Sequence, residues 1–341
     1  MLKETLIRLI EGHEMTAEEA EAAMTVIMSG HASEAEIGAF LVAMRIRGEK
    51  PAQIEGFARC MREACLPVRA RSADLMDTCG TGGDTLQTFN ISTAAALVAA
   101  GAGVKIAKHG NRSVSSRCGS ADVLASLGVA IDLTPEQVAD TIDDCGLGFM
   151  FAPSLHPAMK YAIGPRRALG IRTVFNILGP LTNPAGASRQ LLGVFAPELT
   201  EILAETLGRL GSVHALVVHG LDGLDELSTL GVTRVSELKN GVVKTRHLSP
   251  EEFGFRKAAI DGIAGGDPVY NATIIEAVLA GEVGPERDIV LYNAGATIYV
   301  GGRAPSIASG IALAAESINS GAARQVLDAL RAGATCAVGA R

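Results

Sequence analysis

Short apolar runs that alternate with helical patterns over most of the chain constrain the fold more than any other feature of the sequence. Residues 104–107 (VKIA) and 213–218 (VHALVV) have the length and composition of buried strands. Residues 135–144, with Thr134 and Gln137 placed as a helix cap, and residues 306–331 have the spacing of helices. Strands and helices in alternation favour a mostly parallel sheet covered by helices on both faces. The sequence therefore predicts an α/β fold for this part of the chain.

The first 66 residues differ and are typical of consecutive short helices. Thr16 with Glu19 and Ser33 with Glu36 have the spacing of capping boxes, and Pro51 suits the first turn of a helix. We predict a small N-terminal helical domain over residues 1–66 and a larger α/β domain over residues 72–341, which agrees with the length of 341 residues. A helical segment near residues 159–182 could pack on either domain, and the sequence does not decide which.

Composition and charge argue against several classes of protein. The formal net charge of −7, the lack of Trp and the four Tyr disfavour a generic nucleic-acid binder, which needs a basic surface and aromatic platforms. The six cysteines have no C-x-x-C or zinc-type spacing, which predicts reduced thiols. The most apolar run, residues 91–104, is shorter than the ~20 residues that span a bilayer, and the N-terminal sequence does not resemble a signal peptide. We expect a cytoplasmic protein that binds neither nucleic acid nor membrane.

A glycine-rich stretch, DTCGTGGDTLQTFNISTAAA, leads into an alanine-rich helix at residues 77–96. Glycines let backbone N–H groups approach an anion, and the first turn of the next helix adds free N–H groups and the positive end of a helix dipole. The stretch matches neither the P-loop nor the G-x-G-x-x-G pattern. It can equally be a turn before a helix that Ser92 or Thr93 caps, so alone it leaves phosphate binding open.

A second polar loop makes phosphate binding the better interpretation. In KHGNRSVSSRCGSADVL, at residues 108–124, Lys108 and Arg112 supply positive charge and several serines supply hydroxyl donors. This loop follows the strand-like run at 104–107, and ligands of open α/β sheets bind beyond the carboxyl ends of the strands. Two such loops after two strands favour a ligand that carries several phosphates.

Adjacent acids follow the second strand-like run, in the stretch HGLDGLDELSTLG. Asp225 and Glu226 supply the carboxylate oxygens that suit Mg²⁺ when it also binds substrate phosphates, and Asp222 is a weaker candidate. Because adjacent acids are common on protein surfaces, they indicate a metal site only in combination with the phosphate loops.

Six motifs occur in order along the chain: GTGGD (80–84), NIST (90–93), KHGN (108–111), GSADVL (119–124), HPAMKYAIGPRRALGIRTVFNILGPLTNP (156–184) and DE (225–226). Together they resemble the anthranilate phosphoribosyltransferase family of tryptophan biosynthesis. The resemblance implies transfer of the phosphoribosyl group of 5-phosphoribosyl-1-pyrophosphate (PRPP) to anthranilate, giving N-(5-phosphoribosyl)anthranilate and pyrophosphate. It also implies a helical and an α/β domain, a homodimer formed through the helical domains, and Mg²⁺ carried by PRPP.

The resemblance also implies a role for each residue that matches a family motif. Mg²⁺ is expected at Ser92, Asp225 and Glu226. Anthranilate is expected to meet Gly80, Asn111 and Arg166, with His109 and His156 along the channel by which it enters. The residues expected to line the PRPP site are Gly80, Gly83, Asp84, Thr88, Asn90, Ile91, Ser92, Thr93, Lys108, His109, Gly110, Asn111, Arg112, Ser113, Val114, Ser115, Ser116 and Ser120.

Catalysis by such a site depends on electrostatics and needs no nucleophilic side chain. We expect Lys108 to stabilise the charge that builds on the leaving pyrophosphate, Arg166 to steer the carboxylate of anthranilate, and Asn111 to hydrogen-bond beside it. Thr85 departs from the family pattern, because many relatives have glycine after GTGGD. The loop can therefore be stiffer, which bears on PRPP affinity more than on the type of reaction.

Other readings fit parts of the pattern. A pyrimidine nucleoside phosphorylase shares the general architecture but would lack the paired Asp225 and Glu226 and would have a different glycine loop. A non-catalytic relative that binds nucleic acid would need a basic surface and degraded motifs. Without the family motif, Arg166 and Arg167 would be ordinary surface charges and His109 a satisfied loop histidine.

Overall fold

Four consecutive helices form the N-terminal part of the chain, as the sequence predicts. The computed structural model describes residues 2–83, 86–113 and 117–338. Both predicted capping boxes are confirmed: Glu19 N–H donates to Thr16 Oγ1 (3.2 Å), Glu36 N–H donates to Ser33 Oγ (3.3 Å), and each glutamate accepts from the cap backbone. Pro51 begins the fourth helix, as expected. The helices are α1 (Leu2–Ile10), α2 (Ala17–Met28), α3 (Glu34–Arg47) and α4 (Pro51–Glu63).

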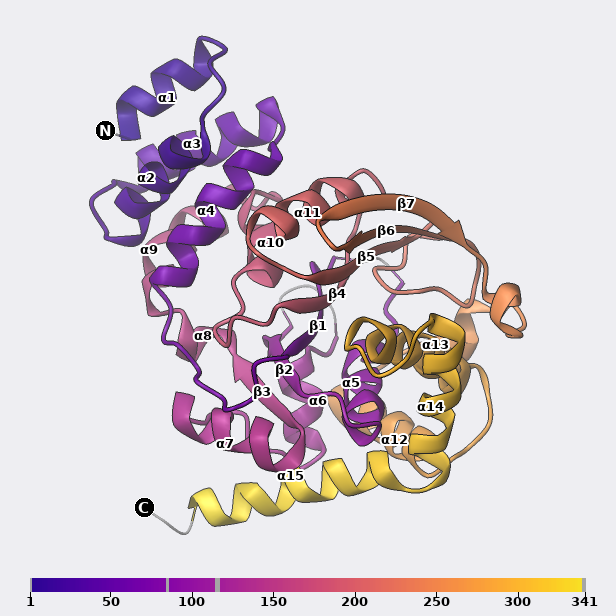
Figure 1. Cartoon of the computed structure of the whole chain (residues 1–341). Helices are drawn as coiled ribbons and strands as arrows, with labels where there is room; N and C mark the ends of the chain where they lie inside the picture. The colour runs from indigo at the N-terminus through magenta and orange to yellow at the C-terminus, as the bar shows by residue number, and fades with distance from the viewer. Residues whose placement is uncertain (1, 84–85, 114–116, 339–341) are drawn as a thin grey trace.

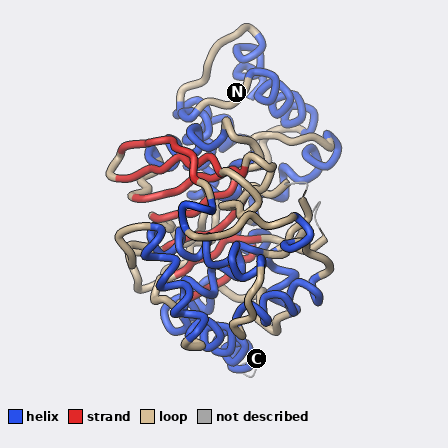
Figure 2. The backbone as a smooth tube through the Cα atoms, turned by 90° about the vertical axis from the view of Figure 1, so that its right-hand side faces the viewer, coloured by secondary structure: helices blue, strands red, loops and turns tan. Residues whose placement is uncertain are grey.

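A seven-stranded sheet lies at the centre of the rest of the described chain (Figures 1 and 2). The order of the strands is β3-β2-β1-β4-β5-β6-β7. The first five strands in this order, β3, β2, β1, β4 and β5, are parallel, and β6 and β7 add an antiparallel hairpin beside β5. The predicted mostly parallel sheet is confirmed. The strands are β1 (Met76–Gly80), β2 (Ile106–Gly110), β3 (Leu147–Phe151), β4 (Arg189–Gly193), β5 (His214–Gly220), β6 (Thr233–Lys239) and β7 (Val242–Leu248).

Helices cover both faces of the sheet (Figure 1). Helix α5 and the C-terminal helices lie on one face, and α10 and α11 lie on the other. The remaining helices are α5 (Ile91–Gly101), α6 (Ser120–Ser126), α7 (Pro135–Cys145), α8 (Ala152–Leu155), α9 (Lys160–Leu169), α10 (Phe175–Leu178), α11 (Leu199–Arg209), α12 (Pro268–Leu279), α13 (Pro285–Val300), α14 (Ile307–Asn319) and α15 (Ala322–Val338), with short 3-10 helices η1 (Pro157–Met159), η2 (Gly179–Leu181), η3 (Pro250–Phe253) and η4 (Ile260–Ile263).

Side chains along the strands point alternately into two large apolar clusters, because successive residues of a strand face opposite sides. Leu191 and Leu216 pack with α5 and the C-terminal helices. Leu192 and Val217 pack in a second cluster, which continues through α10 and α11 into helices α1 to α4. The helical part of the chain therefore shares its core with one face of the sheet.

The segment near residues 159–182 packs on the N-terminal helices and on the sheet. Helix α9 contacts α2 and α3, and Ala162 is fully buried there. Val174 and Leu178, further along, lie in the apolar cluster that continues to the sheet. This segment thus connects the helical part of the chain to the edge of the sheet where the strands end.

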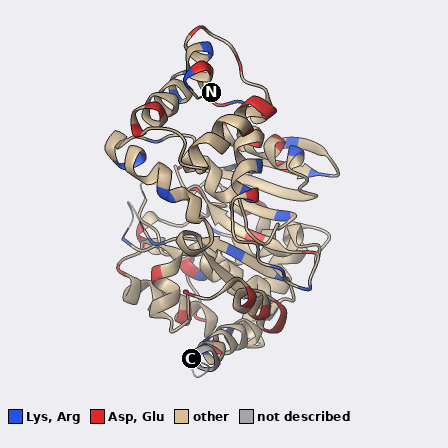
Figure 3. Cartoon of the chain, turned by 90° about the vertical axis from the view of Figure 1, so that its left-hand side faces the viewer, with Lys and Arg blue, Asp and Glu red and all other residues tan. Residues whose placement is uncertain are grey.

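Charged residues of both signs are scattered over the helical and α/β parts of the chain in the view of Figure 3. Neither Lys and Arg nor Asp and Glu gather into a single patch on that face. No helix in the described ranges is long and apolar enough to cross a membrane.

Candidate active site

Strands β1, β2, β4 and β5 end at the same edge of the sheet, and each of them ends on a glycine. Two of these glycines lie directly against the acidic loop that follows β5. A Cβ on Gly80 would lie 2.5 Å from Asp225 Oδ2, and a Cβ on Gly193 would overlap the Asp225 carbonyl oxygen. The absence of side chains at these strand ends therefore lets two segments far apart in sequence, the glycine loop and the acidic loop, pack together.

The loop after β1 has the open backbone of an anion cradle. Gly82 and Gly83 have φ of 65° and 85°, a region that glycine adopts without strain. Gly82 N–H donates to Asp225 Oδ2 (3.1 Å), and Arg172 Nη2 donates to Gly83 O (2.5 Å). The guanidinium of Arg172 also lies 4.2 Å from the centroid of the Phe195 ring. Sequence reasoning missed Arg172, although it lies inside one of the family motifs.

Helix α5 begins beside this loop with Asn90, and not Ser92 or Thr93, as its N-cap. The Asn90 side chain makes no cap hydrogen bond; its Nδ2 donates to Cys118 O (3.1 Å) and its Oδ1 accepts from Asn271 Nδ2 (3.0 Å). This amide ties the start of α5 to the loop after β2 and to α12. A helix N-terminus without a side-chain cap is suited to an anionic ligand.

Neighbouring residues fix the loop that leads into α5. Thr88 forms an isolated bridge with Ala264, and Phe89 N–H donates to Ile263 O (3.3 Å). Ile91 is buried in the core against the sheet. Thr88 and Ile91, predicted at the PRPP site, thus shape the loop.

Lys108 is buried in the middle of β2, with 2% of its surface exposed. Its ammonium group donates to Thr78 O and to Ser92 Oγ, the latter at 3.3 Å. Burial lowers the pKa of Lys108, and the negative charges of Asp77 and Glu226 oppose that shift. The ammonium group therefore lies between β1 and the first turn of α5, at the predicted phosphate cradle.

His109 and His156 lie side by side, with ring centroids 5.0 Å apart. His109 Nδ1 donates to Gly179 O (3.2 Å), and the Nε2 atoms of both rings are buried without a hydrogen-bond partner among the described residues. Burial lowers the pKa of His109 to about 3, with a contribution from His156, and burial lowers the pKa of His156 to about 4. Both imidazoles are therefore neutral at neutral pH.

The loop after β2 is organised by Asp122, which sequence reasoning did not select as a site residue. Asp122 Oδ2 accepts from the N–H groups of Ser113 and Gly119, both at 3.0 Å, and its Oδ1 pairs with Arg112 Nη1 (2.9 Å). Burial acts to raise the pKa of Asp122, but these hydrogen bonds and the charge of Arg112 hold it below its ordinary value. Arg112 is therefore already ion-paired within the loop where it was expected to meet phosphate.

The two ends of this loop meet at Gly110 and Ser120. Asn111 O accepts from Ser120 Oγ (3.4 Å), and a Cβ on Gly110 would collide with that same hydroxyl oxygen. Four residues predicted for the PRPP site lie outside the described residues: Asp84, Val114, Ser115 and Ser116.

The acidic loop after β5 is held by its own hydrogen bonds and by α13. Asp222 accepts from Leu224 N–H (3.1 Å) and from Ser228 Oγ (2.6 Å), so it shapes the turn. Asn293 of α13 accepts from Leu227 N–H (3.0 Å) and donates to Leu227 O (2.9 Å). These contacts fix the backbone on both sides of the predicted metal-binding acids.

Asp225 and Glu226 face the two phosphate loops. Burial raises the pKa of Asp225, while the Gly82 N–H and the charge of Arg172 act in the opposite direction. Glu226 is close enough to Lys108 for its charge to oppose the lowering of that pKa. The two acids are thus adjacent in sequence but interact with different elements, Asp225 with the loop after β1 and Glu226 with Lys108 of β2.

Arg166 lies in the last turn of α9, with its guanidinium 5.2 Å from the centroid of the Phe175 ring. Burial alone lowers the pKa of Arg166, with no charged neighbour contributing among the described residues. A partly buried guanidinium of this kind is suited to a planar anionic group such as a carboxylate.

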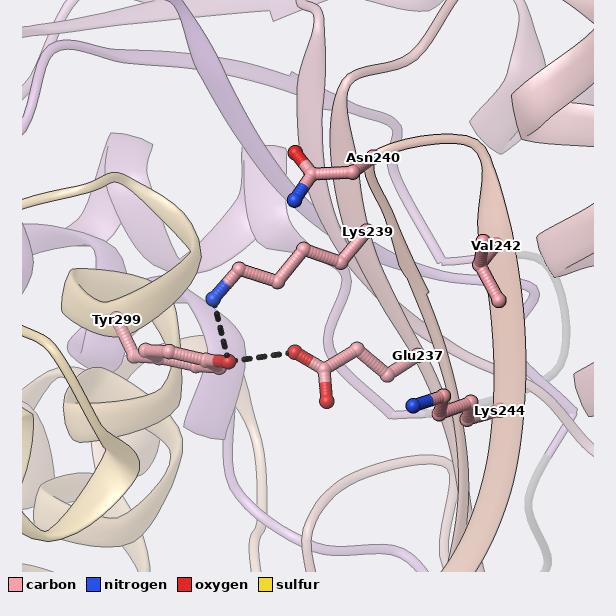
Figure 4. Close-up of a pocket in the computed structure, with 6 residues that line it drawn as sticks. All are labelled: Glu237, Lys239, Asn240, Val242, Lys244 and Tyr299. Atoms are coloured by element: carbon pink, nitrogen blue, oxygen red, sulfur yellow. Dashed lines mark hydrogen bonds between the residues drawn. The ribbon is translucent and has the colours of Figure 1, made fainter.

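A separate hollow lies at the opposite edge of the sheet. Its volume is about 350 Å³, and Tyr299 OH there donates to Glu237 Oε1 (2.6 Å) and accepts from Lys239 Nζ (3.0 Å). Lys239 pairs with His214 at the start of β5, so the hollow is one strand length, about 20 Å, from the acidic loop. The hollow is lined by Glu237, Lys239, Asn240, Val242, Lys244 and Tyr299 (Figure 4).

Comparison with known proteins decides the family. Residues 72–324 match the glycosyl transferase family, a/b domain, and residues 3–65 match the glycosyl transferase family, helical bundle domain. The anthranilate phosphoribosyltransferase of Moorella thermoacetica is 52% identical to this chain over 330 residues, which cover 97% of each protein. The chain belongs to the anthranilate phosphoribosyltransferase family.

Solved structures of anthranilate phosphoribosyltransferases have the same fold. The crystal structure of the enzyme from Thermus thermophilus matches with a TM-score of 0.92 and 46% identity, over 96% of this chain and 98% of that one. The enzyme from Saccharomyces cerevisiae in complex with PRPP and Mg matches with a TM-score of 0.89 and 30% identity, over 98% of both chains. The predicted family, enzyme class and fold are therefore confirmed.

Proposed function

We propose that this chain transfers the phosphoribosyl group of PRPP to the amine of anthranilate and releases pyrophosphate, with Mg²⁺ as cofactor. The observation that carries the proposal is the convergence of the glycine loop, Lys108 and the acidic loop at one edge of the sheet. Structures of the yeast enzyme with PRPP and Mg, and with 4-fluoroanthranilate, support both substrates. The division into domains at residues 1–66 and 72–341 is part of the same proposal.

PRPP has its phosphates at the glycine loop and at the N-terminus of α5 in this proposal. The backbone of Gly80 and Gly83 approaches the phosphates. The first turn of α5, residues 90–93, has no side-chain cap and supplies hydroxyls and the positive end of the helix dipole. Lys108 supplies a fixed positive charge. The remainder of the PRPP site consists of Thr88, His109, Gly110, Asn111, Arg112, Ser113 and Ser120, together with Asp84, Val114, Ser115 and Ser116.

The residues present fit Mg²⁺. The carboxylates of Asp225 and Glu226 and the hydroxyl of Ser92 are hard oxygen donors, which Mg²⁺ prefers together with substrate phosphates. Asp225 accepts a hydrogen bond from the loop that would hold those phosphates. When bound, Mg²⁺ would neutralise part of the charge on the pyrophosphate.

Anthranilate lies between Gly80, Asn111 and Arg166, with its carboxylate on the guanidinium of Arg166. The neutral state of His109 and His156 supports this orientation, because neither ring offers a competing positive charge at neutral pH. The two rings line the channel by which anthranilate enters. Arg166 and Asn111 hold the amine toward the anomeric carbon.

The reaction is a substitution at the anomeric carbon of the ribose, in which the C–O bond to pyrophosphate breaks and a C–N bond to the anthranilate amine forms. Negative charge builds on the departing oxygen, and Lys108 with the α5 N-terminus stabilises it without moving. The aromatic amine is a weak base that loses its proton late in the reaction. No side chain is therefore required as a strong general base.

Dimerisation through the helical domain is a further part of the proposal. Ile10 of α1 is 72% exposed and Ile46 of α3 is 78% exposed, and Ile163 of the adjacent α9 is also exposed. Exposed aliphatic side chains on several neighbouring helices are typical of an interface. Light scattering should give a dimer for the native chain and a monomer for Ile46→Glu; a native monomer would contradict this.

The test of the reaction is the decay of anthranilate fluorescence after addition of protein, PRPP and Mg²⁺. Lys108→Ala should abolish the decay, because it removes the charge at the cradle, and EDTA should do the same. Lys239→Ala, at the opposite edge of the sheet, is the matched lysine control and should leave the rate within about twofold. Asp225→Asn combined with Glu226→Gln should weaken turnover across a magnesium titration.

Two outcomes would contradict the proposal in different ways. No decay, with pyrophosphate still bound by calorimetry, would leave the cradle in place but remove anthranilate as the acceptor. Decay that persists in EDTA, or in the variant without both acids, would remove Mg²⁺ from the acidic loop.

A further inference from the structure

The two strands that carry the phosphate loops pair only at their beginnings. β1 and β2 share one pair of partners, Met76 with Ile106, whereas β1 with β4 and β2 with β3 each pair along five residues. Met76 N–H donates to Lys105 O (2.9 Å), one residue before its partner. If this register continued for two residues, Thr78 would pair with Lys108. Thr78 N–H would then donate to Ala107 O, and Thr78 O would accept from His109 N–H. The parallel ladder therefore opens where the phosphate loops begin.

Asp77 and Asn183 occupy the opened part of the ladder. His109 N–H, which the continued register would place on Thr78 O, donates to Asp77 Oδ1 (3.1 Å). Ala107 O accepts from Asn183 Nδ2 (2.9 Å), and the same amide donates to Asp77 Oδ2 (2.7 Å). Asp77 and Asn183 thus form a bridge between β1 and β2 in which side-chain bonds replace backbone bonds.

The opening also explains where Lys108 points. Thr78 O, which the continued register would pair with a backbone N–H of β2, accepts from the Lys108 ammonium group. The same ammonium donates to Ser92 Oγ at the start of α5 (3.3 Å). If β1 and β2 paired fully, this carbonyl oxygen would be taken by the ladder.

The burial of Asp77 is unusual for an aspartate. Its side chain is fully buried, and it forms no ion pair with any described residue. A buried carboxylate is costly unless hydrogen bonds and nearby charge stabilise it. Here the donors are the Asn183 amide, the His109 N–H and, at 3.6 Å, the Cys79 thiol, and the charge of Lys108 lies nearby. Asn183 is itself anchored, since its Oδ1 accepts from Ala185 N–H (2.9 Å).

We infer that Asp77 is a positioning residue, which together with Asn183 holds the ends of β1 and β2 apart and so sets the spacing between the two phosphate loops and the direction of Lys108. The inference rests on the proposed function for its effect on turnover, but its effect on anion binding can be measured without the reaction. Asp77 is fully buried and acts through His109 N–H and through the ladder that it keeps open.

The experiment measures pyrophosphate binding by calorimetry, with kcat/KM for PRPP as the second readout. Asp77→Asn places an amide nitrogen opposite the amide of Asn183, so we expect both quantities to fall about tenfold or more. Glu237→Gln is the matched control, because Glu237 is a largely buried carboxylate that accepts from Tyr299 at the opposite edge of the sheet. It should lower stability similarly but leave pyrophosphate affinity and kcat/KM within about twofold.

The exchange Asp77→Asn with Asn183→Asp gives the readout that a merely structural role would not produce. The new amide at position 77 can accept from His109 N–H and donate to the new carboxylate at position 183, which restores the contact between the two side chains. The bond from position 183 to Ala107 O is not restored, so we expect the loss to shrink from tenfold or more to about threefold. If the Asp77→Asn variant does not fold, the exchange variant alone decides. A pyrophosphate affinity within about tenfold of the native chain would then support the inference, and a larger loss would overturn it.

Three results would overturn the inference: Asp77→Asn within twofold of the native chain, equal losses for Asp77→Asn and Glu237→Gln, or no recovery in the exchange variant. Failure of the proposed function has a different pattern. A native chain that does not consume anthranilate, but whose pyrophosphate affinity still depends on Asp77, would remove the acceptor and leave the positioning role in place.

Discussion

Acidification from pH 7 to pH 5 should destabilise this protein through two buried imidazoles, and His156→Gln should remove about half of that effect. The pKa values of His109 and His156, about 3 and about 4, lie below the ~6.5 of an exposed histidine. As the pH falls below ~6.5, the unfolded chain therefore takes up protons that the folded chain does not. The stabilisation is complete above ~6.5 and is lost as the pH falls toward the folded pKa values.

The magnitude follows from the size of that pKa gap. Each group contributes about 1.4 kcal/mol per pH unit within the window, so the free energy of unfolding falls by about 2 kcal/mol per histidine between pH 7 and pH 5. Solvent screens this effect little, because His109 and His156 are only 6% and 7% exposed. The two together correspond to about 4 kcal/mol, which is a large fraction of the stability of an ordinary domain.

Urea unfolding at pH 7, 6 and 5 measures the effect directly. The native chain and His156→Gln should differ by about 2 kcal/mol in how much stability they lose between pH 7 and pH 5. His247→Gln, on the exposed strand β7, is the control and should match the native chain. The contributions of the other titrating groups to the pH dependence are the same in both proteins and therefore cancel in the comparison. An identical pH dependence for the native chain and His156→Gln would refute the reasoning, because it would mean that the imidazole is hydrated or protonated in the folded state.

Three further predictions concern single side chains. Gly80→Ala should lower kcat/KM for PRPP more than tenfold in steady-state kinetics, because the new Cβ would lie 2.5 Å from Asp225 Oδ2; full activity would contradict the packing. Arg166→Ala should raise KM for anthranilate about tenfold or more and KM for PRPP far less, and equal effects on both would remove its assigned role. Tyr292→Phe should leave the urea midpoint unchanged or raise stability by about 1 kcal/mol, because the Tyr292 hydroxyl is buried without a described partner; a clear loss would contradict this.

The parts of the fold that sequence predicts well are those whose signals are local. Thr16 with Glu19, and Ser33 with Glu36, form capping boxes within three residues, and both boxes occur in the structure. The alternation of strands and helices after residue 70 is likewise read from neighbouring residues, and it leads correctly to the mostly parallel sheet. Packing of residues 159–182 could not be read in this way, because it depends on which apolar faces are left open by other helices.

The start of α5 shows where a local rule fails. A hydroxyl near the first turn is a good N-cap, which favours Ser92 or Thr93, but the helix begins after Asn90. The Asn90 side chain is used elsewhere, between Cys118 and Asn271, and these partners are distant in sequence. The Ser92 hydroxyl instead lies inside the first turn and accepts from the ammonium group of Lys108, which comes from β2.

Charge partners in the candidate site were the hardest to predict. Arg112 has the position and charge of a phosphate ligand, yet its guanidinium pairs with Asp122, ten residues further along the chain. Arg172 lies in a quoted motif, but its contact with Gly83 O joins segments 89 residues apart. Neither interaction has a spacing rule in the sequence, because each depends on how loops from different strands meet at the edge of the sheet.

The opening between β1 and β2 is another feature that depends on contacts between distant segments. Paired strands lie about 4.8 Å apart, which leaves no room for side chains in the plane of the sheet, whereas a buried lysine ammonium must reach a carbonyl oxygen there. The ladder therefore has to end early, and the freed backbone groups need buried partners. Here those partners are Asp77, Asn183 and Lys108, two of which are charged. Pattern rules treat a charged residue in a strand as a sign of an exposed face, so they assign Asp77 to solvent although its side chain is fully buried.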